Sequence, residues 1–159
     1  MKGTLMDISI ASLDDIKTIT STTCFLSSSY RLLDGYFSSS TYEAKCQTPT
    51  PSFVIKIDTI TTYLIKIISL NKVNSSLCFN IFQIVETEKC FSYKAIFEKI
   101  STFLINEFNV SRIYTYILSS EIEHLTIVSK TMSLEASLEE QVFVDNNYLT
   151  LNIYAYNLR

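Results

Sequence analysis

Glycine is almost absent from this chain of 159 residues, which contains only Gly3 and Gly35. An average protein of this length contains roughly ten glycines. Loops that hold a phosphate group through several closely spaced glycines, such as the Walker A and G-x-G-x-x-G loops, are therefore excluded. A phosphate site in this protein must be built in another way.

Patterns for metal binding and for disulfide bonds are missing too. The only histidine is His124, and no two cysteines form a C-x-x-C pair, so the spacing of zinc ligands is absent. We expect no metal site, and reduced cysteines in a cytoplasmic protein. The cysteines are Cys24, Cys46, Cys78 and Cys90.

The chain has no long run of basic or of apolar residues. The formal net charge is −3 and no lysine or arginine stripe is present, which argues against nucleic acid as a partner. No apolar run approaches the roughly 18 residues that a membrane helix needs, and residues 1–7 lack the apolar segment of a signal peptide. We therefore expect neither a membrane partner nor secretion, and a single domain over residues 1–159.

The clearest pattern present is a strand, a polar loop and a helix between Ser76 and Phe108. Apolar and aromatic residues dominate Leu77–Val85, and the polar sequence Glu86–Lys89 follows. Apolar residues then recur at helical spacing up to Phe108. A loop that enters a helix presents free N–H groups, which suit phosphate, although the same pattern also describes a strand simply packed on a helix.

The N-terminal half predicts three strands. Alternating apolar residues favour strands at Leu5–Ile10, Phe53–Ile57 and Tyr63–Leu70, the last two joined as a hairpin across Asp58-Thr59. Ser12 is the expected N-cap of a helix with acidic residues in its first turn. Residues 21–50 give only a weak helical signal.

The C-terminal half predicts a strand at Arg112–Leu118, parallel to the one before the loop. A helix at Glu121–Lys130 follows, and then strands Leu138–Val144 and Leu149–Tyr156 around an Asn-Asn turn. Together these elements predict an α/β (α+β) fold. Its mixed, mostly antiparallel sheet has a central parallel strand pair and helices on both faces.

This order of elements resembles the GNAT superfamily of N-acetyltransferases over nearly the whole chain. Residues 134–148 look like the closing hairpin of GNATs related to ribosomal-protein N-terminal and amino-sugar acetyltransferases. Tyr63–Ile67 stands where such proteins carry the third strand. The resemblance implies acetyl-CoA or another acyl-CoA as the acyl donor.

The resemblance also implies where the donor binds. The family's loop reads Gln/Arg-x-x-Gly-x-Gly/Ala, and Thr87–Ser92 stands in its place, with Cys90 at the first glycine. The loop cation is missing, and Cys90 takes up room that a glycine would leave for the phosphates. Main-chain N–H groups near Ile84 and Val85 would polarise the thioester carbonyl at a splay between the parallel strands, expected near Val85 and Tyr116. The implied donor-binding residues are Ile84, Val85, Lys89, Cys90, Phe91, Ser92, Tyr93 and Lys94.

The catalytic residues of the family are only partly matched. The usual tyrosine of the following helix is missing, because no tyrosine lies between Tyr116 and Tyr148. Tyr116 is the remaining candidate for the general acid, and Glu86 for the base that deprotonates an amine. The alternatives are a packed aromatic ring and a solvated loop carboxylate. Cys90 as a nucleophile is a further alternative.

The acceptor implied by the resemblance is a small-molecule amine or a peptide N-terminus, bound near Tyr30 and Tyr36. Three functions stay open: an acyl-CoA-dependent N-acyltransferase, a GNAT-fold partner or regulatory subunit without activity, and an enzyme that takes its acyl group from a carrier protein. An aromatic-rich final strand also predicts pairing of two copies into a homodimer.

Overall fold

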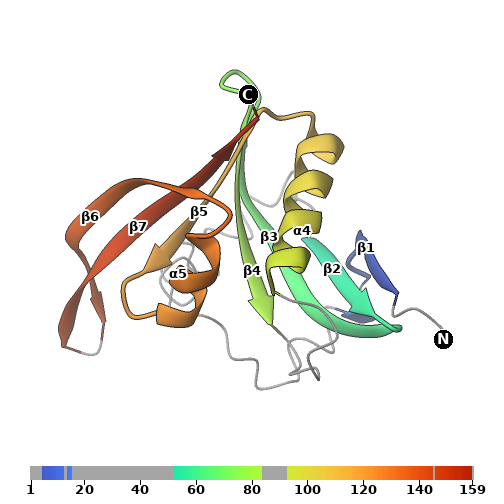
Figure 1. Cartoon of the computed structure of the whole chain (residues 1–159), viewed down its shortest axis with the longest axis horizontal. Helices are drawn as coiled ribbons and strands as arrows, with labels where there is room; N and C mark the ends of the chain where they lie inside the picture. Colours follow the sequence, from blue (N-terminus) through green and yellow to red (C-terminus); the bar gives the residue numbers. More distant parts are fainter. Residues whose placement is uncertain (1–4, 13, 16–51, 84–92, 145, 159) are drawn as a thin grey trace.

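The computed structural model describes residues 5–12, 14–15, 52–83, 93–144 and 146–158 (Figure 1). Within these ranges a single sheet of seven strands has the order β1-β2-β3-β4-β5-β7-β6, and two helices pack on it. The elements are β1 Met6–Ile10, β2 Ser52–Ile57, β3 Ile60–Asn71, β4 Ser76–Gln83, α4 Tyr93–Phe108, β5 Arg112–Leu118, α5 Ile122–Val128, β6 Ser133–Val144 and β7 Asn147–Asn157.

The first four strands form an antiparallel meander, which confirms the strands predicted in this half. The hairpin between β2 and β3 turns at Asp58 and Thr59, whose φ angles of 47° and 75° are left-handed. Such angles normally favour glycine. The turn is tied down instead, since the N–H of Asp58 donates to the Leu5 carbonyl at 3.0 Å and the Asp58 carboxylate accepts from the Leu5 N–H at 2.9 Å.

The chain then crosses from β4 through α4 to β5, which pairs with β4 in parallel. Helix α4 ends before Asn109, where a φ of 49° stops the helical hydrogen bonds. Asparagine tolerates this conformation better than other non-glycine residues. The predicted parallel pair and its helical connection are confirmed. With the remaining strand pairs antiparallel, the fold class predicted from the sequence is confirmed as well.

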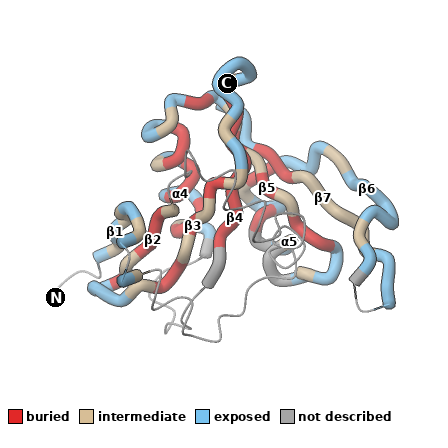
Figure 2. The backbone as a smooth tube through the Cα atoms, turned by 180° about the vertical axis from the view of Figure 1, so that it is seen from behind, coloured by how far each residue is buried: buried red, intermediate tan, exposed pale blue. Residues whose placement is uncertain are grey.

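One apolar core lies between α4, α5 and the middle of the sheet, where the tube in Figure 2 is coloured as buried. Alternate residues of the strands point into it, and the Phe79 and Phe97 rings pack with their centroids 6.0 Å apart. The strand residues that alternate with these core residues point to the other face of the sheet and are buried too. Both faces of the central strands are therefore shielded from water. These second-face residues include Val54, Thr62, Cys78, Asn80 and Leu118.

Both described helices contribute to this one core, through Ile96–Ile105 of α4 and Val128 of α5. Most of the helix predicted to begin at Ser12 and the weak helical signal of residues 21–50 lie outside the described part of the chain.

The position of the last strand differs from the prediction. The aromatic-rich β7 lies between β5 and β6 and pairs with both, so it has no free edge. The strand with an open edge at this end of the sheet is β6. The prediction was wrong because the order of strands in a sheet is decided by tertiary pairing, and the residues of β7 look the same at an edge and inside.

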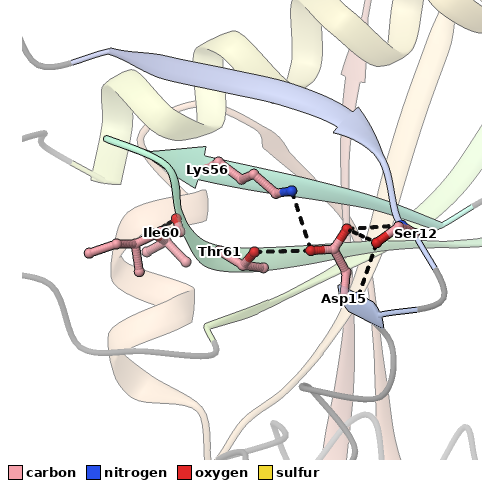
Figure 3. Close-up of polar contacts among 6 residues, drawn as sticks. Ser12, Asp15, Lys56, Ile60 and Thr61 are labelled. Carbon is pink, nitrogen blue, oxygen red and sulfur yellow. Dashed lines mark hydrogen bonds and ion pairs between the residues drawn. The ribbon is translucent and has the colours of Figure 1, made fainter.

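The start of the N-terminal helix is held by a cluster of polar side chains (Figure 3). The Ser12 hydroxyl accepts from the Asp15 N–H at 3.1 Å and donates to the Asp15 carboxylate at 2.7 Å, which confirms Ser12 as the N-cap. The Lys56 ammonium lies 3.4 Å from the same carboxylate, and the Thr61 hydroxyl donates to it at 3.2 Å. Asp15 therefore connects the helix start to β2 and β3.

These contacts predict a stability that depends on pH. Hydrogen bonds from the Ser12 side chain and main chain, followed by the charge of Lys56, lower the pKa of Asp15 from 3.8 to about 2. A depressed carboxyl pKa stabilises the fold at pH values above the unfolded pKa, and this contribution is lost as the pH falls from about 4 towards 2. We expect Asp15→Asn to lower the free energy of unfolding at pH 7 by roughly 1–2 kcal/mol, and by less at pH 2.

Urea unfolding of the wild-type protein and of Asp15→Asn across this pH range measures their free energies of unfolding. Glu107→Gln, which removes an exposed carboxylate of α4 that makes none of these hydrogen bonds, is the control. An equal loss of stability for Asp15→Asn at pH 7 and pH 2 contradicts the prediction.

Candidate active site

The two parallel strands stay together over only a short distance. Strand β4 pairs with β5 at Ser76, Leu77 and Cys78 alone, opposite Arg112, Ile113 and Tyr114. Beyond these pairs β4 remains bonded to β3 and β5 remains bonded to β7, but the two strands separate from each other, as Figure 1 shows. We call the region where the two strands are no longer paired with each other, with Phe79–Gln83 on one side and Thr115–Leu118 on the other, the β4–β5 wedge.

The splay predicted from the sequence is confirmed, but it begins earlier than expected. The strands separate after Cys78 rather than near Val85 on the β4 side. On the β5 side they separate after Tyr114, two residues before Tyr116. The wedge therefore reaches further into the sheet than the sequence indicates.

A hydrogen bond crosses the narrow end of the wedge. The Thr115 hydroxyl donates to Oδ1 of Asn80 at 2.9 Å, and the two residues are only 2% and 3% exposed. Nδ2 of the same asparagine has no hydrogen-bond partner. Among the residues that the structure describes, it is the one buried side-chain nitrogen or oxygen that has no hydrogen-bond partner.

The thiol next to this bond is chemically inert. Cys78 is 1% exposed, and burial raises the pKa of its thiol to about 12 against smaller opposing effects of Arg112 and Tyr114. A thiol with this pKa stays protonated at physiological pH and is a poor nucleophile. Cys78 therefore packs the narrow end of the wedge and does not react there.

Two tyrosines of β5 stack beside the wedge. The Tyr114 and Tyr116 rings meet edge to face with centroids 5.8 Å apart, and the Arg112 guanidinium lies 4.4 Å from the Tyr114 centroid. Arg112 also pairs with Glu135 of β6, which holds it in place. Burial, followed by the neighbouring Cys78 and Tyr114, raises the pKa of Tyr116 above its ordinary value of 10. Tyr116 is therefore a neutral phenol that can donate a proton or a hydrogen bond.

Helix α4 begins at Tyr93, the first described residue after β4. Its first turn contains no acidic side chain. Lys94 is exposed and lies 3.6 Å from Glu98 one turn later. Lys94 also lines a groove of about 560 Å³ along α4. Lys130 and Thr131 after α5, and Tyr156 and Leu158 at the end of β7, form its other wall.

Most of the predicted site residues lie outside the described ranges. Of the predicted set, the structure places Tyr116 and Lys94, and the backbone of Tyr93. Tyr116 packs edge to face against Tyr114, and Lys94 pairs with Glu98. The residues that fall outside are Tyr30, Tyr36, Ile84, Val85, Glu86, Lys89, Cys90, Phe91 and Ser92.

Sequence reasoning missed the residues at the narrow end of the wedge. Asn80 is a buried amide between two core residues, Phe79 and Ile81, in a strand that the sequence predicts from its apolar and aromatic residues. Asparagine is disfavoured in strands. A buried polar residue in the middle of an apolar strand was the available signal.

Among the described residues, no group of three or more histidine, cysteine, aspartate or glutamate side chains could hold a metal ion. None of the helices in the described ranges is long and apolar enough to cross a membrane.

Solved structures similar to this chain are N-acetyltransferases. A chimaera of the spermidine N-acetyltransferase SpeG from Vibrio cholerae and hSSAT superposes with a TM-score of 0.72 at 13% identity, over 96% of both chains. A protein assigned as a phosphinothricin N-acetyltransferase superposes with a TM-score of 0.70 at 10% identity, over 98% of this chain and 99% of the other. No protein-family model matches the sequence, and no curated protein does. The chain thus has the fold of the GNAT N-acetyltransferases.

The buried thiol gives a direct test of the narrow end of the wedge. We expect Cys78 to stay unmodified when the folded protein is treated with iodoacetamide at pH 8, because it is 1% exposed and its pKa is about 12. Peptide mass spectrometry measures the modification, and the same treatment in guanidinium chloride is the control in which Cys78 reacts. Alkylation of Cys78 in the folded protein, at the rate seen in the unfolded protein, contradicts this description.

Proposed function

We propose that this protein is an acyl-CoA-dependent N-acyltransferase that moves an acyl group, with acetyl as the first candidate, to an amine. The observation that carries the proposal is the β4–β5 wedge, which opens between parallel strands directly before the loop that leads to α4. An extended chain can bond to strand edges that are not paired with each other, as peptides do at the edge of a sheet. The pantetheine arm of coenzyme A is an extended chain with amide groups.

The diphosphate of the donor is assigned to the loop and to the first turn of α4. Its contacts would be Lys89, Cys90, Phe91, Ser92, Tyr93 and Lys94, and main-chain N–H groups near Ile84 and Val85 would polarise the thioester carbonyl. The absence of acidic side chains from the first turn of α4 supports this, because the positive end of the helix dipole is left uncompensated. The 16-residue length of α4 gives a complete dipole.

The reaction that these residues would perform is direct transfer. Acyl-CoA supplies an activated thioester. Glu86 takes a proton from the amine, the nitrogen forms a bond to the carbonyl carbon, and the bond from that carbon to sulfur breaks. Tyr116 gives a proton to the departing sulfur, and its raised pKa means that the phenol is protonated when the reaction begins.

The acceptor is proposed to be a small-molecule amine or a peptide N-terminus near Tyr30 and Tyr36. The similar structures are named for spermidine and phosphinothricin, both small amines, so small amines are the first acceptors to screen. We also propose a cytoplasmic location. For a homodimer, the open edge of β6 replaces the final strand as the surface where two copies pair.

A second candidate is an inactive GNAT-fold partner or regulatory subunit. The observation in its favour is Cys90 in place of the first loop glycine, together with Glu86 and Glu88 beside a polyanion. An acyl donor bound to a carrier protein is the remaining alternative, because a phosphopantetheine arm can use the wedge without a diphosphate site.

Calorimetric titration separates these functions. We expect acetyl-CoA and free coenzyme A to bind with a Kd in the micromolar range, on the order of −8 kcal/mol. The control is Lys94→Ala, which should weaken both ligands modestly by removing one charge near the diphosphate. Absence of heat at millimolar ligand contradicts the acyl-CoA proposal and directs the search to carrier-bound donors and protein partners.

The placement of the diphosphate predicts a gain of affinity. We expect the double substitution Cys90→Gly and Phe91→Gly to tighten coenzyme A binding several-fold, because removing Cβ atoms lets main-chain N–H groups approach the phosphates. The matched control is Ser137→Gly with Phe143→Gly, which introduces two glycines into exposed positions of β6. If the loop variant gains no affinity, the phosphates do not bind at this loop.

A further inference from the structure

The groove along α4 shares no residue with the β4–β5 wedge. Its volume of about 560 Å³ lies in the range of small-molecule sites. It extends from Lys94 in the first turn of α4 to Asn106 in the last turn, roughly 18 Å along the helix axis. Its wall on β7 includes Tyr156, which pairs with Ile113 where β4 and β5 are still joined. Most of the groove therefore lies away from the open end of the wedge.

Three hydroxyl groups of the groove can accept hydrogen bonds but have already used their own hydrogen. Ser101, Thr102 and Thr131 each donate to a main-chain carbonyl three or four residues earlier, at 2.9, 3.0 and 3.2 Å. Ser101 is 9% exposed, so it belongs to the floor of the groove. A ligand must therefore bring hydrogen-bond donors to these three oxygen atoms.

Three other polar groups of the groove have no partner in the described part of the chain. The Lys130 ammonium, the Asn106 amide and the Tyr156 hydroxyl form neither a hydrogen bond nor an ion pair with any described residue. Lys94, in contrast, lies 3.6 Å from the Glu98 carboxylate. Among the described lining residues Lys130 thus carries the one unpaired charge, which attracts an anion and repels an amine.

These properties together define a class of ligand. An anionic group meets Lys130, and the donors that the three hydroxyl oxygens require are neutral hydroxyl groups, since amines are repelled. The amide of Asn106 can both donate to and accept from such hydroxyls. The exposed ring of Tyr156, with Leu158 beside it in the lining, offers an apolar surface to the C–H groups of the ligand.

We propose that this groove binds an anionic sugar, a small molecule with several hydroxyl groups and one phosphate or carboxylate. The site is separate from the proposed acyl-donor site, and the proposal does not depend on the proposed function. Its members come from three parts of the fold: α4, the segment after α5 and the end of β7. A bound sugar would therefore join these parts to one another.

The test is calorimetric titration of the full chain with four probes. These are glucose 6-phosphate, glucuronate, glucose and inorganic phosphate. We expect at least one anionic sugar to bind roughly tenfold more tightly than glucose and than inorganic phosphate, because only an anionic sugar supplies both the charge and the hydroxyl donors. The tighter of the two anionic sugars identifies the anionic group.

Two exposed residues give variants with different expected effects. Lys130→Gln should weaken the anionic sugar roughly three- to tenfold and leave glucose unchanged, because it removes only the charge. Thr102→Val removes an acceptor and should weaken both sugars by a similar, smaller factor. The matched control is Lys72→Gln, which removes an exposed lysine of the β3–β4 turn that is not part of the groove.

NMR of the ¹⁵N-labelled wild-type protein locates the ligand without any substitution. The amide signals of Ser101–Asn106 and of Lys130 and Thr131 should shift with the anionic sugar. No shift at millimolar sugar overturns the proposal. Equal affinity for inorganic phosphate and for the anionic sugar means an adventitious ion only, and also overturns it.

The ribose phosphate of coenzyme A is a further probe, because its chemistry is similar. If coenzyme A shifts the same groove signals or competes with the sugar, the groove belongs to the donor site and the proposal is overturned. Unchanged sugar binding in the presence of coenzyme A supports a separate site. Failure of acetyl-CoA to bind, in contrast, contradicts the proposed function alone, since the sugar titration does not involve an acyl donor.

Discussion

The three residue pairs that join β4 to β5 are the contact on which the rest of the structure depends. They are the only pairs that link the antiparallel meander of β1–β4 to the antiparallel β5, β7 and β6 within the described chain. Because the pairing is parallel, both strands run in the same direction away from it, and their separation opens a wedge towards the loop that leads to α4. The core residues of α4 pack beside this junction and hold the two parts of the sheet together.

The wedge joins two kinds of environment. Its narrow end is buried and uncharged, with a protonated thiol at Cys78 and a fixed amide at Asn80. Its wide end leads to the N-terminus of α4, where the helix dipole and Lys94 favour negative charge. A ligand with an anionic end and a neutral carbonyl at the other end matches this gradient. The acyl-CoA donor proposed above has that distribution of charge.

Much of the fold could be predicted from the sequence, because it depends on local patterns. Apolar and aromatic residues located β1 to β5, and helical spacing up to Phe108 located α4. Features that depend on tertiary pairing could not be predicted. The placement of β7 inside the sheet and the separation of the strands at Cys78 are set by which residues meet across strands. The buried amide of Asn80 was missed for the same reason, since its hydrogen bond with Thr115 joins residues of two different strands.

The most direct test of the wedge as the ligand site is amide hydrogen exchange, measured by mass spectrometry with and without acetyl-CoA. The strand edges that line the wedge should exchange more slowly when the ligand bonds to them. We predict slower exchange in peptides that contain Phe79–Gln83 and Thr115–Leu118, with β1 and β2 unchanged. Protection confined to other parts of the chain, or no protection at saturating ligand, would contradict the account.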